Sequence, residues 1–293
     1  MTAAVLKLIA MVSMLADHLG FTLRAVGALG NYQQYLWLRS LGRLAFPIFA
    51  YLIGEGLRYT RDKGRYLQRL WMCAVVSAIP YSLLCGTSTQ GGFLFSPVFF
   101  ALTALGVLGL VFLVMRDRKS VSLLLWIAGA FALSLVSLSY KNVLFLSTSL
   151  NTLYTLALGA TCVVFMEKGL DPDAKEHGRV AYPLLAGLLL MLMGSRVSFG
   201  FLGLALVAVF GFLRKWKWAQ LAAAVVWCFA EFWPSTPQST RFLLFALAAV
   251  VCLALYNGKK GTSRLPKEFF YWFYPLHLLV LGIVKAAPML WGA

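Results

Sequence analysis

One stretch decides the fold of this chain: Ala3-Ala4-Val5-Leu6-Lys7-Leu8-Ile9-Ala10-Met11-Val12-Ser13-Met14-Leu15-Ala16-Asp17-His18-Leu19-Gly20-Phe21. It is long and apolar enough to cross a bilayer, since a spanning helix needs about 20 such residues. It nevertheless contains three ionisable side chains, those of Lys7, Asp17 and His18. Ionisable groups at membrane depth cost about 2.5–3.5 kcal/mol each on insertion scales, so they point to function.

The spacing of these side chains along a helix sharpens this prediction. Lys7 and His18 lie roughly 20° apart around the helix axis and about 16 Å apart along it. One helix face therefore presents a cation near one membrane surface and an imidazole more than halfway across. Asp17 is turned about 100° from His18 and is expected to find a cation on another helix. The alternative is that Lys7 extends to the headgroups and that His18 is a satisfied core histidine.

The composition places the chain among membrane proteins. It has 293 residues, of which 61% are hydrophobic, and a mean hydropathy of +0.80. Soluble domains contain only about 45–50% apolar residues, so we expect a polytopic membrane protein that forms a single domain over residues 1–293. Cations in loops account for the net charge of +16, and nucleic acid is not an expected partner. The five cysteines form no C-x-x-C pair, which favours packing thiols over a metal site.

Apolar runs separated by charged or turn-forming clusters predict an all-α transmembrane bundle of about 10–11 spans. The predicted spans are residues 3–23, 35–57, 67–86, 93–115, 120–139, 143–166, 180–194, 198–213, 217–233, 240–256 and 269–290. The loops on one side hold most cations, within residues 58–69, 116–119, 168–179, 214–217 and 259–267. The loops on the other side hold Arg24, Arg39, Lys141, Arg196 and Arg241. The positive-inside rule then predicts a cytoplasmic N-terminus, with His18 toward the outer leaflet.

The second predicted span contains Arg39-Ser40-Leu41-Gly42-Arg43-Leu44-Ala45-Phe46-Pro47. It runs from outside to inside, so Arg43 lies at a depth near Asp17, where an arginine–carboxylate pair would make both charges tolerable. A structural pair and a direct catalytic role for Arg43 are compatible. Pro47 cannot donate to the carbonyl of Arg43, so we expect a bend near this level. Glu55 follows, deeper toward the cytoplasm.

The densest cationic patch covers residues 58–69 and includes Arg61, Arg65 and Arg69. Arginine binds phosphates bidentately, which favours a phosphate cradle. The alternative is a patch that sets topology and contacts anionic lipid.

A second polar cluster occupies the last two predicted spans. Asn257-Gly258 indicates a turn at a helix end. The run Phe273-Tyr274-Pro275-Leu276-His277 lies within a span, where Pro275 leaves the carbonyl of Tyr271 without its helical donor. That carbonyl needs another partner. The aromatic residues fit an interface belt, but a histidine at this place is more than packing requires.

These segments together resemble the TraX family of integral membrane proteins, a branch of the transmembrane acyltransferases. The matching segments are Leu6-Lys7-Leu8-Ile9-Ala10-Met11 with Asp17-His18, residues 42–49 with Glu55-Gly56, residues 66–70, Leu150-Asn151-Thr152-Leu153-Tyr154, residues 255–261 and residues 273–277. The Lys7-x10-His18 spacing is similar to the cation-x10-His pattern of the wider acyltransferase group. The chain departs from the family at Ser198-Phe199-Gly200, where the family often has Asp-Tyr-Gly, so an acidic role there does not carry over.

The resemblance implies a multi-pass enzyme of the bacterial cytoplasmic membrane that takes acetyl-CoA, or another acyl-CoA, from the cytoplasm and uses no metal. The family's named activity is N-acetylation of a pilin amino terminus. For this chain the expected acceptor is an amine or hydroxyl of a pilin-like peptide, a glycan or a small molecule. The pantetheine arm, roughly 15–20 Å long, would lie along the Lys7-to-His18 face, which spans about 16 Å.

Specific residues are expected to carry out catalysis and donor binding. His18 is the expected general base, with Asp17 beside it, and an acyl-histidine intermediate is the alternative. The expected donor-binding residues are Lys7, Arg43, Arg61, Arg65, Arg69, Asn257, Tyr274 and His277, supported by Glu55 and Asn151.

Two other functions fit the same residues. A secondary transporter would relay protons or ions through Asp17, Arg43, Glu55 and His277, but it predicts a repeat symmetry that the sequence does not show. A non-enzymatic membrane assembly factor would use all these groups as structural pairs and would bind no CoA.

Overall fold

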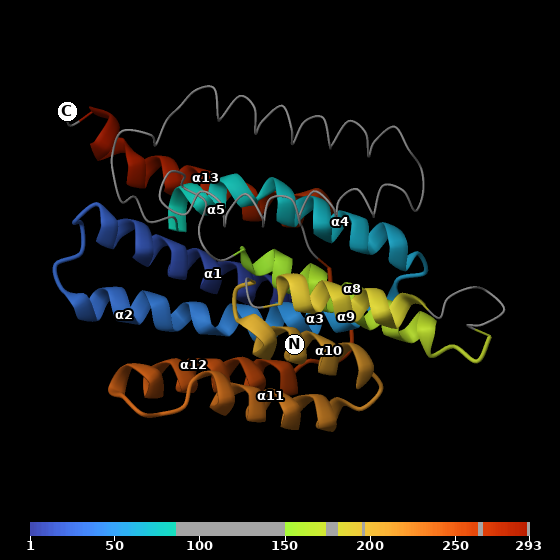
Figure 1. Ribbon diagram of the computed structural model, residues 1–293. Coiled ribbons are helices and arrows are strands. Elements are labelled where there is room, and N and C mark those ends of the chain that lie inside the picture. The colour runs from blue at the N-terminus through green and yellow to red at the C-terminus, as the bar shows by residue number, and fades with distance from the viewer. Residues whose placement is uncertain (86–149, 174–180, 195–196, 263–265, 292–293) are drawn as a thin grey trace. The chain divides into compact units, whose positions relative to one another are not determined.

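The structure, a computed structural model, describes residues 1–85, 150–173, 181–194, 197–262 and 266–291. The elements in these ranges are helices (Figure 1), apart from one isolated bridge between Leu150 and Val197. The all-α prediction is confirmed for this part of the chain. The predicted spans 93–115 and 120–139, and the first residues of 143–166, lie outside the described residues.

Five of the described helical segments are long and apolar enough to cross a membrane. They are Ala3–Ala25, Tyr32–Tyr59, Lys63–Cys85, Pro237–Ala254 and Phe269–Ala287, and Gly200–Phe212 is a shorter apolar helix. These segments support the membrane character predicted from composition. The total number of spans and the side on which the N-terminus lies stay predictions.

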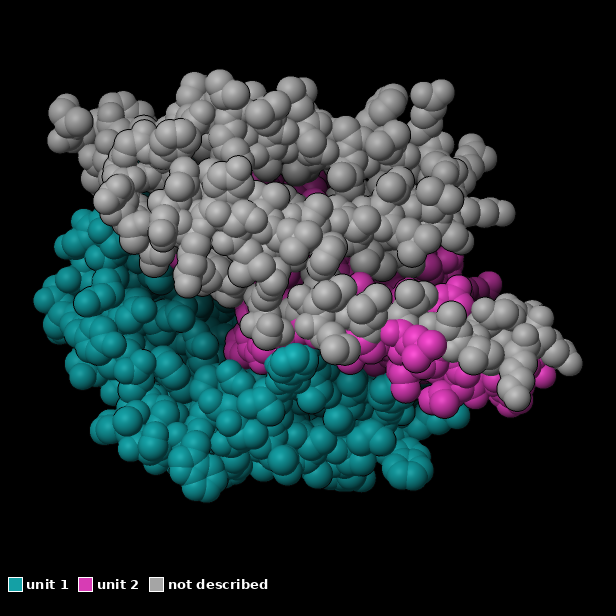
Figure 2. Space-filling view, viewed as in Figure 1, with its two compact units in different colours: residues 1–59, 201–270, 283–293 teal, residues 60–200, 271–282 magenta. Residues whose placement is uncertain are grey.

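The chain divides into two compact units, coloured separately in Figure 2: residues 1–59, 201–270 and 283–293, and residues 60–200 and 271–282. The first unit contains α1 (Ala3–Ala25), α2 (Tyr32–Leu41), the 3-10 turn η1 (Gly42–Leu44), α3 (Ala45–Tyr59), α10 (Gly200–Phe212), α11 (Lys217–Glu231) and α12 (Pro237–Ala254). Here α1 packs along α2, η1 and α3, while α12 packs against α2, η1, α3 and α11 (Figure 1). Its core includes the fully buried side chains of Leu6, Ile48 and Phe210.

The predicted second span, residues 35–57, is not one regular helix. Helix α2 ends at Leu41, η1 covers Gly42–Leu44, and α3 begins at Ala45. Pro47 is the third residue of α3, a position at which a helix can spare the backbone N–H. The bend expected near Pro47 stays a prediction, and the interruption that the structure shows falls in the three residues that include Arg43.

The second unit contains α4 (Lys63–Val76), α5 (Ala78–Cys85), α8 (Thr152–Gly169), α9 (Ala181–Met193) and the middle of α13 (Lys267–Trp291). Helix α8 packs against α4 and α9, and its residues 154–165 are buried all round. The predicted third span, residues 67–86, is two helices that meet at Ser77. The Ser77 hydroxyl donates to Cys73 O (2.6 Å), and Pro80 has no N–H with which to continue the helical ladder.

A short turn before α10 is held in an uncommon backbone conformation. Phe199 has φ = 64°, which few residues other than glycine adopt. Its neighbour Ser198 donates to Leu150 O from its backbone (3.1 Å) and its hydroxyl (2.7 Å). The Ser198 carbonyl accepts from Thr155 Oγ1 (2.5 Å). In this chain Ser198 therefore has a structural role, at the place where the family pattern often has Asp.

Close approach of α3 and α10 generates a first prediction. A Cβ on Gly54 would lie 2.7 Å from Phe210 O, and small residues let membrane helices approach this closely. Gly54→Ala is expected to destabilise the protein by about 1–3 kcal/mol through overpacking, measured as a lower midpoint of thermal unfolding in detergent. Gly187→Ala is the control, because a Cβ there meets nothing within 4 Å. Equal midpoints for the two variants would contradict the prediction.

Candidate functional site

The Asp17 carboxylate is held by two arginines in the first unit. Arg39 Nη1 donates to Asp17 Oδ2 (2.5 Å), and Arg43 Nη2 donates to Asp17 Oδ1 (2.8 Å). The Asp17 and Arg43 side chains are 14% and 13% exposed, and that of Arg39 is 27% exposed. The predicted Asp17–Arg43 ion pair is confirmed. Because each oxygen has its own charged donor, the carboxylate is fixed in both position and rotation.

Local sequence explains why this two-arginine clamp can form. Arg39 and Arg43 are four residues apart, so they lie on the same side of the α2–η1 segment. Arg43 Nε donates to Arg39 O (3.1 Å), and the Arg43 guanidinium lies over the Phe242 ring, 5.0 Å from its centroid. A Cβ on Gly42 would lie 2.4 Å from Asp17 Cβ. Only glycine at position 42 lets the carboxylate come this near.

His18 follows the clamped residue on the same helix and is buried, with 9% of its surface exposed. Its backbone carbonyl accepts from Thr22 Oγ1 (3.1 Å) within α1. Lys7, near the start of α1, holds its ammonium group 5.3 Å from the Phe270 ring centroid. Because α1 is continuous from Ala3 to Ala25, Lys7 and His18 keep the separation of about 16 Å along its axis that the sequence predicts.

Glu55 and Asn257 belong to a network where α12 ends. Tyr256 Oη donates to Glu55 Oε2 (3.3 Å), and Arg58 Nη1 lies 3.9 Å from Glu55 Oε1. Asn257 forms the expected turn, with its Oδ1 accepting from Lys259 N (3.1 Å) and Gly258 at φ = 74°. The Asn257 backbone N–H donates to Met1 O (2.9 Å). This turn therefore binds the beginning of α1.

The predicted phosphate-binding arginines lie at the start of α4 in the second unit. Arg61, Arg65 and Arg69 are exposed. Arg65 Nε lies 3.0 Å from the carboxylate of Asp62, the N-cap residue of α4, and Arg69 Nε donates to Arg65 O (3.3 Å). The Arg65–Asp62 pair is solvent-exposed, and such pairs contribute little to stability. Breaking this pair therefore costs little.

His277 and Tyr274 lie in the middle of α13, also in the second unit. Both are buried. The His277 ring stacks on Phe273 at 4.8 Å, and its Nδ1 lies 2.7 Å from Phe273 O. Because a carbonyl can only accept, Nδ1 donates this hydrogen bond to Phe273 O.

Pro275 leaves the carbonyl of Tyr271 without its helical donor, and a side chain of another helix takes the place of that donor. Cys73 Sγ donates to Tyr271 O (3.3 Å) from α4. Asn151 plays a similar part, since its Nδ2 donates to Ala74 O (2.9 Å) while its Oδ1 caps α8 through Leu153 N and Tyr154 N. The expectation of a compensating partner at Tyr271 is confirmed. Asn151 acts as a structural link between α4 and α8.

The predicted site residues are thus divided between the units. The first unit holds Lys7, Asp17, His18, Arg43, Glu55 and Asn257, and the second holds Arg61, Arg65, Arg69, Asn151, Tyr274 and His277. Sequence reasoning missed Arg39, which it assigned to an outside loop, although the four-residue spacing to Arg43 is visible in the sequence. It also missed Cys73, since nothing in a lone cysteine indicates its partner. Within the described ranges no three His, Cys, Asp or Glu side chains gather as around a metal ion.

Comparison with known proteins adds one match. The sequence profile of the family described as TraX protein matches residues 2–146 and 97–285. These ranges include every predicted site residue. No curated protein and no solved structure matches the chain.

The clamp generates a prediction about stability. Removing one partner of a buried ion pair costs about 3–5 kcal/mol because a charge is left unpaired, and exposed pairs cost far less. Asp17→Asn, which leaves both arginines unpaired, and Arg43→Gln are therefore expected to lower the midpoint of thermal unfolding more than Arg39→Gln, whose side chain is more exposed. The measurement uses detergent-solubilised protein. An Arg39→Gln variant less stable than Arg43→Gln would overturn this order.

The Cys73–Tyr271 bond is testable by a double-mutant cycle. Cys73→Ala removes the donor, and we expect it to cost about 0.5–1 kcal/mol, the range of hydrogen bonds between membrane helices. Pro275→Ala supplies a backbone N–H to Tyr271 O, so in that background Cys73→Ala is expected to cost much less. Thermal unfolding of the four proteins gives the coupling. Strictly additive shifts would show that the thiol does not compensate for Pro275.

Proposed function

The chain belongs to the TraX family, and from this premise we propose that it is an integral membrane acyltransferase. It moves an acetyl group from acetyl-CoA to an amine or hydroxyl of a membrane-associated or extracytoplasmic acceptor. His18 is the proposed general base, and Asp17 fixes the local charge and the position of α1 beside it.

One observation carries this proposal: a buried histidine follows directly after a carboxylate clamped by two arginines inside an apolar helix. Packing alone does not favour such a residue, because an apolar side chain would fill the place without the cost of a polar ring. The clamp neutralises Asp17, so the carboxylate does not act as a second base. The His18 imidazole is then the group on α1 that is proposed to take and return a proton.

In the proposed transfer the acetyl group moves from the sulfur of CoA to the acceptor. The acceptor nitrogen attacks the thioester carbonyl carbon, so that a C–N bond forms and the C–S bond breaks. His18 takes the proton that the amine loses and returns a proton to the departing thiolate of CoA. For a hydroxyl acceptor the bond formed is C–O, and the proton follows the same route.

Donor binding is assigned to the basic residues. Lys7 lies along α1 from His18, at a distance that matches the pantetheine arm, and Arg61, Arg65 and Arg69 suit phosphate groups. The His277 ring and the Tyr274 hydroxyl are the proposed polar contacts for the rest of the donor. The bacterial cytoplasmic membrane, where acetyl-CoA is present on one side, is the proposed location.

The test is transfer of labelled acetyl groups by the purified full-length protein to peptides with a free amino terminus. His18→Ala is expected to lower the rate by about 10²–10⁴-fold, the usual contribution of a general base. Acetyl-CoA should still raise its melting temperature, since the variant keeps the donor-binding residues. His177→Ala, which changes a histidine in the charged segment 167–179, is the control and should keep full activity.

Three results would contradict the proposal. Equal activity of His18→Ala and the unaltered protein would remove the role of His18. Absence of any melting shift with acetyl-CoA would favour an assembly factor, and ion uptake into proteoliposomes without an acyl donor would favour a transporter.

A further inference from the structure

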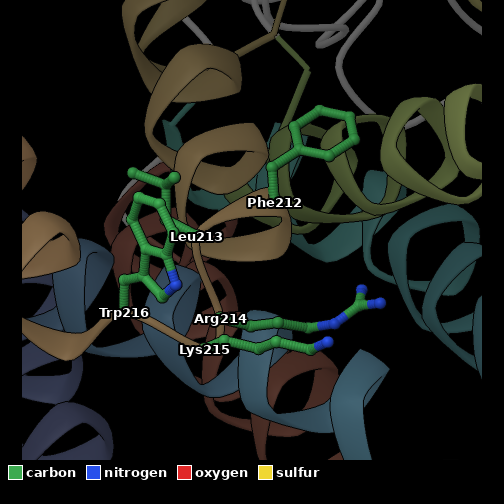
Figure 3. A pocket seen from close by; sticks show the side chains of 5 residues that line it. All are labelled: Phe212, Leu213, Arg214, Lys215 and Trp216. Carbon is green, nitrogen blue, oxygen red and sulfur yellow. The ribbon is translucent and has the colours of Figure 1, made fainter.

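A cavity of about 370 Å³ lies at the turn between α10 and α11 in the first unit. Phe212, Leu213, Arg214, Lys215 and Trp216 line it. Figure 3 shows the Arg214 and Lys215 side chains extending alongside each other in one direction, with Phe212 and Trp216 on other sides of the turn. Neither Lys7 nor His18 is among the lining residues.

Hydrogen bonds on both sides hold this turn in place. The Gln220 side chain, which is buried, donates to Phe210 O (2.9 Å) and ties α11 to α10. Trp216 N donates to Leu213 O (2.8 Å) within the turn, and Arg58 Nη1 of α3 donates to Arg214 O (3.3 Å). The cavity wall is therefore preorganised and does not need a ligand to form it.

Three cationic side chains belong to this turn or contact it. Arg58 donates to the Arg214 carbonyl and has the Glu55 carboxylate 3.9 Å away, and Arg214 Nη1 donates to Gly211 O (3.3 Å). Lys215 is exposed and forms no ion pair with a described residue. The neighbouring Lys217 is already engaged, because its Nζ donates to Ala254 O (2.8 Å) and Tyr256 O (2.7 Å) at the end of α12. Charge complementarity favours an anion at Arg214 and Lys215.

The apolar part of the turn indicates where that anion comes from. Trp216 and Trp218 are 69% and 80% exposed, and Phe212 is also exposed. Exposed tryptophans at the end of apolar helices are typical of the membrane–water interface. The cavity volume of about 370 Å³ is at the lower end of the range for small-molecule sites. It suits a lipid headgroup better than a whole acetyl-CoA molecule.

We propose that this turn binds the phosphate of an anionic phospholipid. Arg214 and Lys215 contact the phosphodiester, while Phe212 and Trp216 lie against the glycerol and the first carbons of the acyl chains. The site does not depend on the acyltransferase proposal. It fixes the depth of the α10–α11 turn in the membrane through a specific lipid contact.

The test uses full-length protein in a neutral detergent, titrated with phosphatidylglycerol or with phosphatidylcholine, and native mass spectrometry to count bound lipid. The unaltered protein is expected to bind phosphatidylglycerol in preference to the zwitterionic lipid. The double variant Arg214→Gln/Lys215→Gln is expected to bind phosphatidylglycerol about tenfold or more weakly, since two cations near an anionic surface are lost. If the double variant does not fold, Lys215→Gln alone is used, because its side chain is exposed.

The matched control is Lys259→Gln/Lys260→Gln, which removes two positive charges from exposed positions of the same unit. It should bind phosphatidylglycerol like the unaltered protein. Equal weakening in both double variants would overturn the proposal, because it would show a general surface attraction. Competition by adenosine 3′,5′-bisphosphate would overturn it in favour of a nucleotide site, and equal binding of both lipids would remove the role of the charge.

Discussion

A carboxylate inside an apolar helix must be neutralised, and the first unit is arranged around the ion pairs that neutralise Asp17. Arg39 and Arg43 each donate to one oxygen of the Asp17 carboxylate. This requires two cations four residues apart on the next helical segment, a glycine that lets that segment approach, and a 3-10 turn that presents Arg43. Gly42 and η1 meet these requirements. The polar residues that would destabilise an ordinary span therefore fix the register of α1 against α2 and α3.

The same constraint recurs at backbone carbonyls that have lost their helical donor. The Tyr271 carbonyl accepts a hydrogen bond from Cys73, the Ala74 carbonyl from Asn151, and the Phe210 carbonyl from Gln220. At the end of α12, Lys217 donates to two carbonyls, where a cation also interacts favourably with the negative end of the helix dipole. In an apolar environment each such group costs several kcal/mol if it is left unpaired. Breaks in these helices are thus accompanied by a side chain that makes them tolerable.

Sequence reasoning succeeded where a single rule dominates. The Asp17–Arg43 pair, the need for a partner at Tyr271 and the turn at Asn257 follow from charge burial or from the chemistry of proline and glycine. It failed where the outcome depends on which surfaces meet. Arg39 was placed in a loop because position along the chain does not show that α2 brings it to Asp17. The division of residues 67–86 at Ser77 was missed because the apolar pattern continues across the break, and the donor role of Cys73 is visible only once α4 and α13 are packed together.

The proposed function rests on these observations: a neutralised, rigid carboxylate holds α1, and the buried His18 is proposed to meet an acyl group brought from the cytoplasm. The most direct measurement is an experimental structure of the full-length protein with a non-hydrolysable acetyl-CoA analogue. The account predicts the acetyl carbonyl within hydrogen-bonding reach of the His18 ring, with the phosphates on basic side chains at the other end of the Lys7-to-His18 face. An analogue bound with its acetyl group away from His18 would contradict it.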